Sequence, residues 1–221
     1  MGVTGDRSWY DNRPTLRADA DRIADRYLAL ESGAEESIMA NIITLYHGTI
    51  YEFDKIDITK GKGNKDFGRG FYTSRDIRHA ERLATRNKFI EDERFALRGM
   101  TKCVTPWLYI YNFDLENLTS LSVKEFTATD REWMRFIVLN RESKSKIQEH
   151  DYDIVIGPTA NDNTRAAIQT IMPLTNGQIL TDKAIDALIS LIEPDNLPWQ
   201  FFIGTQHAAD LLRLIERRII L

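Results

Sequence analysis

Short apolar runs recur along the chain, and most are too short to form helices. Runs of β-branched and aromatic residues favour strands. They lie at Ile42–Tyr46, Phe71–Thr73, Trp107–Tyr111, Asp153–Pro158 and Gln200–Ile203. These runs do not alternate regularly with helical segments, as the strands of a doubly wound parallel sheet do. The pattern therefore predicts an α+β fold with small antiparallel sheets.

Segments with helical periodicity follow polar residues whose side chains can cap a helix N-terminus. The predicted caps are Asp76, Thr129 or Asp130, Asn161 or Asp162, Thr181 and Thr205. In the helix after Asp76, the spacing places Ala80, Leu83 and Ala84 inward and the arginines outward. The helix after Thr205 is expected to continue through Ile215. The glycine-rich segment 61–70 is predicted to be a flexible loop.

The first 38 residues differ from the rest of the chain. A helical pattern runs from about Leu16 to Leu30 and ends before Gly33. We predict that residues 1–38 are an N-terminal helical extension and that residues 39–221 form the main domain. A true translation start at Met39 is the alternative explanation for this difference.

Composition narrows the class of protein. With 221 residues, the chain can bury a sizeable core without covalent crosslinks. The single cysteine, Cys103, excludes an intrachain disulfide and a cysteine-based zinc site. No segment reaches the ~20 apolar residues of a membrane span, and no secretory leader pattern is present. We therefore expect a cytoplasmic protein with no membrane association and no metal ion.

Charge is distributed unevenly along the chain. The net charge is −4, yet residues 55–88 contain ten Lys or Arg and four Asp or Glu. A local positive field suits an anionic ligand, either a dinucleotide diphosphate or a nucleic acid. A solvated helix face next to a lysine-rich loop explains the same residues equally well.

Two turn motifs contain the candidate chemistry. Tyr46-His47-Gly48 ends the first predicted strand, and Gly68-Arg69-Gly70-Phe71-Tyr72 follows one loop later. A neutral imidazole can bond a sugar hydroxyl, and a glycine lets the main chain approach a ligand amide. A tyrosine face can stack on a flat, partly cationic ring. Taken separately, His47 and Tyr72 are each more often structural residues than ligands.

Together, the two motifs resemble the first two parts of the His-Tyr-Glu signature of ADP-ribosyltransferases of the diphtheria-toxin and poly(ADP-ribose)-polymerase branch. From about Ile43 to Leu214, the chain also resembles an uncharacterised bacterial family of that superfamily. Further matching segments are Trp133–Arg141, Tyr152–Asp162 and Gln200–Ala208. The resemblance implies an ADP-ribosyltransferase-like fold with a split, bent antiparallel core and NAD in its cleft.

The resemblance also implies residue roles. His47 would hold the nicotinamide-side ribose, the Gly48 main chain would bond the carboxamide, and Tyr72 would stack on the nicotinamide ring. Loop 60–69 would cover the donor, with its cations facing the diphosphate. The implied catalytic residues are His47, Tyr72 and Gln200. The implied NAD-binding residues are Tyr46, His47, Gly48, Thr49, Phe67, Gly70, Phe71, Tyr72 and Ser74.

Gln200 stands where active transferases of this kind have glutamate. A carboxylate stabilises the positive charge that develops at the anomeric carbon, whereas an amide offers only a dipole. Loss of that charge would cost on the order of 10²–10³ in rate. Three outcomes follow: transfer with the acceptor supplying the base, slow transfer, or NAD binding without turnover. Candidates for a substitute carboxylate are Asp153, Asp162, Glu193 and Asp195.

These features predict an NAD-dependent mono-ADP-ribosyltransferase with NAD as substrate. Its acceptor would be a protein or a nucleic acid. Small bacterial proteins of this kind often resemble toxins of toxin–antitoxin or phage-defence systems, which implies an antitoxin protein as a partner. Two alternatives remain: an NAD-binding module of little or no activity, and a nucleic-acid-binding protein that uses residues 55–88.

Overall fold

The computed structural model describes residues 22–25, 41–142, 150–160, 162–171, 181–191 and 197–221. Most of the predicted extension 1–38, and Glu193 and Asp195, lie outside these residues. Within 22–25, the chain is helical and Ile23 is buried in a hydrophobic core.

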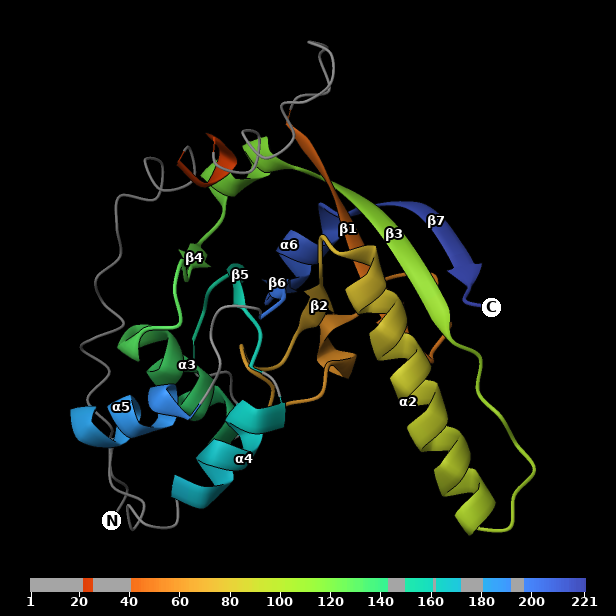
Figure 1. Cartoon of the computed structure of the whole chain (residues 1–221). Coiled ribbons are helices and arrows are strands. Elements are labelled where there is room, and N and C mark those ends of the chain that lie inside the picture. The colour runs from red at the N-terminus through yellow and green to blue at the C-terminus, as the bar shows by residue number, and fades with distance from the viewer. Residues whose placement is uncertain (1–21, 26–40, 143–149, 161, 172–180, 192–196) are drawn as a thin grey trace.

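The strands form two sheets (Figure 1). The first has the order β1-β3-β7 and is antiparallel. Its strands are β1 (Ile42–Thr49), β3 (Trp107–Asp114) and β7 (Arg213–Ile219). The second has the order β2-β6-β5-β4, and only its β4–β5 pair is parallel. Its strands are β2 (Phe71–Thr73), β4 (Val123–Glu125), β5 (Ile154–Pro158) and β6 (Trp199–Ile203).

Helices cover the two sheets separately (Figure 1). The long α2 (Ile77–Leu97) packs on β1, and α3, α4 and α5 gather beside the second sheet. Their bounds are Arg131–Glu142, Asp162–Ile171 and Asp182–Ser190. The short helices are η2 (Ile58–Lys60), η3 (Leu115–Ser120) and α6 (Gln206–Asp210). None of the helices in the described ranges combines the length and apolar character of a membrane span.

The residues of β6 divide between two hydrophobic cores. Phe201 and Ile203 join Leu45 and Tyr109 in the first core, whereas Phe202 joins Phe67 in the second. Successive strand residues point to opposite faces, so one short strand contributes to both cores. The second core also contains the α3 side chains Trp133, Phe136 and Ile137.

The structure confirms the mixed α+β class and all five predicted strands. Asp76, Thr181 and Thr205 cap helices, each accepting a main-chain N–H. Asp130, not Thr129, accepts the N–H of Trp133 at the start of α3.

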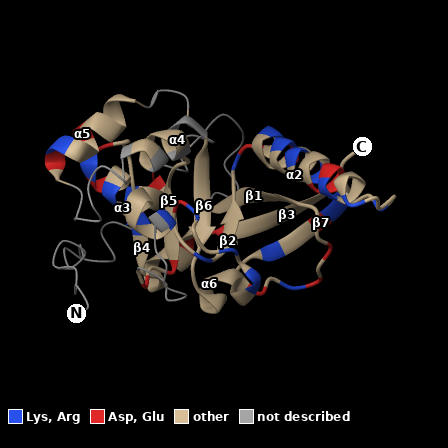
Figure 2. Cartoon of the chain, turned by 90° about the horizontal axis from the view of Figure 1, so that it is seen from below, with Lys and Arg blue, Asp and Glu red and all other residues tan. Residues whose placement is uncertain are grey.

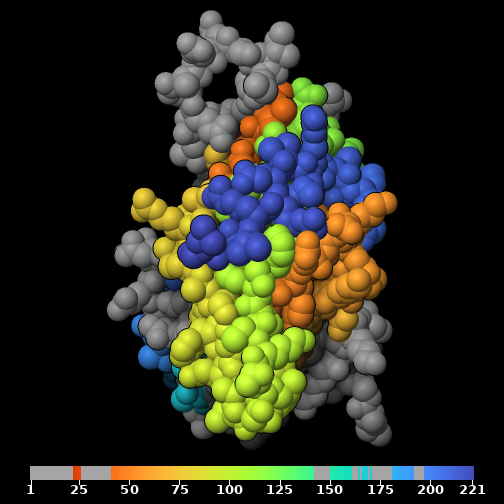
Figure 3. All heavy atoms as spheres, turned by 90° about the vertical axis from the view of Figure 1, so that its right-hand side faces the viewer, coloured from red at the N-terminus to blue at the C-terminus, as the bar shows by residue number. Residues whose placement is uncertain are grey.

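Three details of the predicted elements are wrong. Leu83 is 40% exposed, not turned inward, and β4 runs parallel to β5. The last helix ends at Asp210, and the chain to Ile219 forms β7. Every residue of β7 is exposed (blue in Figure 3). The strand therefore has no buried face that would produce an alternating apolar pattern in the sequence. Pairing with β3 defines this strand.

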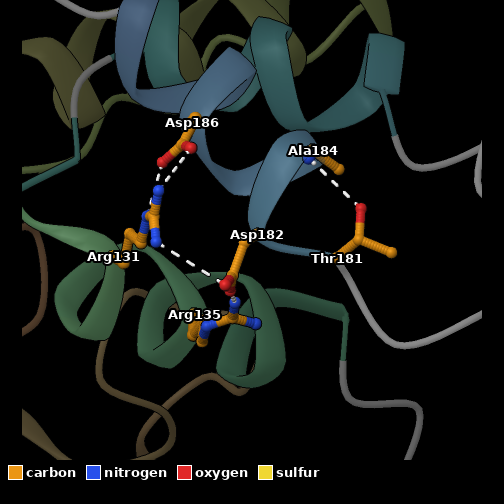
Figure 4. Close-up of polar contacts among 6 residues, drawn as sticks. All are labelled: Arg131, Arg135, Thr181, Asp182, Ala184 and Asp186. Atoms are coloured by element: carbon orange, nitrogen blue, oxygen red, sulfur yellow. Dashed lines mark hydrogen bonds and ion pairs between the residues drawn. The ribbon is translucent and has the colours of Figure 1, made fainter.

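Salt bridges fasten α3 to α5 on the surface. The guanidinium of Arg131 donates two 2.6 Å hydrogen bonds to Asp186, and both Arg131 and Arg135 pair with Asp182 (Figure 4). The side chains of Asp186 and Asp182 are 49% and 67% exposed. Solvent therefore screens the pairs, and each contributes little to the stability of the fold.

Candidate functional site

The two sheets meet where β1 lies beside the end of β2. Tyr46 and Ser74 exchange main-chain hydrogen bonds of 2.8 and 2.9 Å, and this bridge is the point of pairing between them. Ladder geometry would pair Gly48 with Tyr72 next. The strands instead separate there. We call this separation, bounded by Tyr46, Gly48, Tyr72 and Ser74, the fork.

Gly48 turns its main chain toward the fork. Main-chain groups alternate between the two edges of a strand, and Tyr46 uses the β2 edge, so Gly48 faces the same edge. Across the described residues, no main-chain hydrogen bond to Gly48 occurs on that edge. A buried N–H and C=O therefore stand ready for a partner.

A glycine is required at position 48 because α2 packs directly against it. A Cβ atom there would overlap the carbonyl group of Ala80. The absence of a side chain at Gly48, expected to let a ligand approach the main chain, is therefore also needed for the packing of α2.

His47 occupies the gap between the separating strands. Its Nδ1 lies 2.7 Å from the carbonyl oxygen of Tyr72. A carbonyl can only accept, so Nδ1 carries the proton, and the neutral ring leaves the Nε2 lone pair as an acceptor. Burial lowers the pKa of His47 to about 4, which keeps the ring neutral at pH 7. Its ring packs at 4.2 Å from that of Phe71, with Phe53 and Tyr109 beyond.

Tyr72 is held by its hydroxyl group. The hydroxyl donates to the carbonyl oxygen of Gly68 at 2.7 Å and accepts the N–H of Phe67 at 3.2 Å. Burial, assisted by the nearby Asp66 carboxylate, raises the pKa of Tyr72 well above its ordinary value. The ring packs against Phe202 at 5.0 Å.

The rings of His47 and Tyr72 lie on opposite faces of β2. His47 packs on Phe71, and consecutive residues of a strand point to opposite sides. The structure thus brings His47 to the main chain of Tyr72 rather than to its ring. A ligand that contacts both side chains would have to lie across the open end of the ladder.

Gln200 is placed by the pairing of β2 with β6. Thr73 lies opposite Phe201, so Gln200 comes next, beside Ser74, and on its other side it pairs with Gly157. It is half-buried. Residues opposite each other share a face, so Gln200 lies on the face of Tyr72 and Phe202, one step from Tyr46. The third predicted site residue is therefore next to the fork.

Asp153 cannot replace the missing carboxylate beside Gln200. Its Oδ2 accepts the N–H of Ser122 at 2.8 Å, and its Oδ1 accepts the Thr205 hydroxyl at 2.5 Å. It precedes β5 at the end opposite to Gly157, the partner of Gln200. The Asp162 side chain, Glu193 and Asp195 lie outside the described residues.

The remaining predicted residues make hydrogen bonds and packing contacts within the fold around the fork. The Ser74 hydroxyl donates to the carbonyl oxygen of Trp199 at 3.2 Å, and that of Thr49 accepts the N–H of Tyr51. Phe67 is buried in the second core. Gly70 lies so close to Phe202 and Ile203 that a Cβ would overlap them.

The second half of the glycine-rich segment is anchored, contrary to the flexible loop predicted for residues 61–70. Asp66 is buried, pairs with Arg141 at 2.5 Å and accepts the N–H of Ala160. His150 donates through Nε2 to the carbonyl oxygen of Phe67 at 2.8 Å. Gly68 completes the turn with a φ of 89°, which favours glycine. These contacts fix the turn that presents Tyr72.

Sequence reasoning assigned no role to Asp66, Arg141 or His150. A signal for Asp66 was available, because it is the only acidic residue among the cations of segment 60–69. Its partners come from 75 and 94 residues further along the chain, so no local pattern identifies them.

Comparison with known proteins identifies a family. Residues 43–214 match the model of DUF3990, described as a protein of unknown function. The chain belongs to the DUF3990 family. No curated protein and no solved structure matches it. In the described part of the chain, no cluster of three or more His, Cys, Asp or Glu side chains could hold a metal ion.

Proposed function

We propose that this DUF3990 protein is an NAD-dependent mono-ADP-ribosyltransferase that binds NAD at the fork and acts on a macromolecule. The observation that carries the proposal is the interrupted ladder at Gly48 and His47. There the Gly48 main-chain N–H and C=O have no main-chain partner on the β2 edge among the described residues, and they lie beside an imidazole whose Nε2 can accept a hydrogen bond. The resemblance of the two turn motifs to ADP-ribosyltransferases supports the same assignment.

The chemistry of NAD suits these groups. A carboxamide has one N–H donor group and one C=O acceptor, so it can pair with Gly48 as a neighbouring strand would. The Nε2 of neutral His47 can accept the hydrogen bond of a ribose hydroxyl. Tyr72 and Gln200 would bound the site from the other face of β2.

The proposed transfer proceeds through an oxocarbenium-like state. The bond from the anomeric carbon to nicotinamide breaks, and its electron pair neutralises the pyridinium charge. A lone pair of the acceptor forms the new bond to the anomeric carbon, and the acceptor proton passes to water. The amide dipole of Gln200 would stabilise the developing positive charge only weakly, so we expect slow turnover.

Nicotinamide release from NAD by the purified full chain tests the proposal. We expect measurable release that falls roughly 10–100-fold in H47A, the loss expected for a buried hydrogen bond. NAD should also raise the melting temperature of the wild type more than that of H47A. Equal release by the two proteins, with no shift in melting temperature, would refute the proposal.

Gln200 favours a second candidate function, an NAD-binding module without turnover. No described acidic side chain takes over the position next to Ser74, and Asp153 is bonded elsewhere. A melting shift that depends on His47, without nicotinamide release, would select this candidate.

A further inference from the structure

The charge on α2 is polarised along its length. Residues 75–88, which cover the first half of the helix and the two residues before it, contain five Lys or Arg and two acidic residues. Residues 89–97 contain three acidic residues and one arginine. Figure 2 shows Lys and Arg recurring along α2. The basic half is the one next to the fork, because Ser74 directly precedes it.

The arginines form a stripe on the outer side of the helix. Arg78, Arg82 and Arg86 are spaced four residues apart, so they are neighbours on one face, and all three are exposed. Ala80 and Ala84 are buried on the opposite side, toward β1. Phe89 lies on the outer side, three residues after Arg86, and is 63% exposed.

Helix stability does not explain Arg78 and Arg82 at the start of α2. The N-terminal end of a helix dipole is positive and disfavours cations, and the first turn of α2 contains no acidic residue. Arg82 lies 3.7 Å from Asp76, but both side chains are largely exposed, so the pair contributes little. Phe89, which is 63% exposed, likewise buries little apolar surface at its position.

We propose that a single-stranded nucleic acid docks along Arg78, Arg82, Arg86 and Phe89 and is the acceptor of the transferase. This inference rests on the proposed function of the fork. Arginines along a groove or helix neutralise phosphates, and an exposed aromatic ring stacks on a base. Ala80, which packs on Gly48, lies on the side of α2 opposite to the stripe, but Arg78 stands at the end of the helix next to the fork. A strand docked on the stripe would therefore extend past this end of the helix to reach the fork. An unpaired base or terminal phosphate then offers the attacking lone pair.

Fluorescence anisotropy with labelled oligo(dT) and oligo(rU) 20-mers tests the docking. We expect R78Q/R82Q in the full chain to bind about tenfold more weakly, with a salt slope smaller by about 1 to 2. F89A should weaken binding about five-fold or more and leave the slope unchanged.

The variant R94Q/R98Q provides a matched control on the same helix. It removes the same number of positive charges, and Arg94, like Arg82, has an exposed ion pair, here with Glu91. We expect it to bind within about twofold of the wild type, because it lies outside the stripe. Transfer of radiolabel from NAD to the oligonucleotide should fall in R78Q/R82Q and persist in R94Q/R98Q.

The failure of this inference is distinguishable from failure of the proposed function. Absence of wild-type binding to both oligonucleotides, tighter binding to duplex DNA, or equal effects of the two double variants would overturn the docking site. In each of these cases, NAD binding and nicotinamide release by the wild type would remain as proposed. R78Q/R82Q should release nicotinamide without acceptor at the wild-type rate.

Discussion

The imidazole of His47 bonds the carbonyl oxygen of Tyr72 at the position where the main-chain pairing between β1 and β2 stops. Its proton on Nδ1 is committed to the carbonyl oxygen of Tyr72, so the ring both joins the strands and presents a lone pair. Burial lowers its pKa to about 4, against an ordinary value near 6.5. The same ring therefore serves the fold and the proposed site in its neutral form.

The pKa of His47 predicts a loss of stability in acid. Between pH 6.5 and 4 the unfolded chain binds a proton at this residue that the folded chain does not, so stability falls as pH falls. At pH 4.5 the loss attributable to His47 should be about 2 to 3 kcal/mol relative to pH 7. Urea unfolding of the wild type and H47N at both pH values measures it, since the asparagine amide can still donate to Tyr72.

H47N should lose less stability than the wild type over this pH range. An identical loss in the two proteins would show that other groups titrate there and that His47 is not the buried neutral ring described above.

Among the elements, the turn that ends in β2 owes its shape to distant partners. Asp66 is tied to Arg141 at the end of α3 and to Ala160 after β5. This buried contact differs from the surface salt bridges between α3 and α5 in Figure 4, whose carboxylates are about half exposed or more. Burial decides which of the two salt bridges matters for stability.

We expect D66A to destabilise the protein by about 3 to 5 kcal/mol, because it leaves the partly buried Arg141 without its carboxylate. The matched variant D182A removes a carboxylate from the exposed salt bridges between α3 and α5. It should lower the free energy of unfolding by about 1 kcal/mol or less. Chemical denaturation compares the two free energies of unfolding. Similar costs for both variants would contradict the buried role of Asp66.

For the whole molecule, the fork is where two separately covered sheets join. A ligand that pairs with Gly48 and contacts Tyr72 would couple the sheet of β1 to that of β2. Binding to the folded state stabilises it by mass action, by about 2.7 kcal/mol at a ligand concentration 100 times Kd. The effect should be strongest in the elements that form the fork.

Hydrogen exchange with and without NAD measures this coupling. We expect slower exchange in peptides covering 46–50 and 71–75, because the Gly48 N–H, which bonds no described main-chain group on the β2 edge, gains a partner. We expect no change in β7. The same experiment on H47A should show little protection. Protection confined to β7, or none at a concentration that raises the melting temperature, would place NAD elsewhere.

Local patterns in the sequence determined five of the strands, three of the helix caps and the mixed class of the fold. Strand propensity and capping depend on neighbouring residues, so runs such as Phe71–Thr73 and caps such as Asp76 are readable without the tertiary structure. The exposed β7 could not be predicted, because its strand state comes from pairing with β3.

The sequence by itself also brought out His47, Gly48 and Tyr72 as candidates, because aromatic, histidine and glycine residues cluster in two turns. Only the tertiary structure decided how they meet. Strand alternation places the rings of His47 and Tyr72 on opposite faces, and where the ladder splits Gly48 has no partner in β2. Long-range contacts from Arg141 and His150 fix the turn between them, and such contacts leave no trace in local spacing.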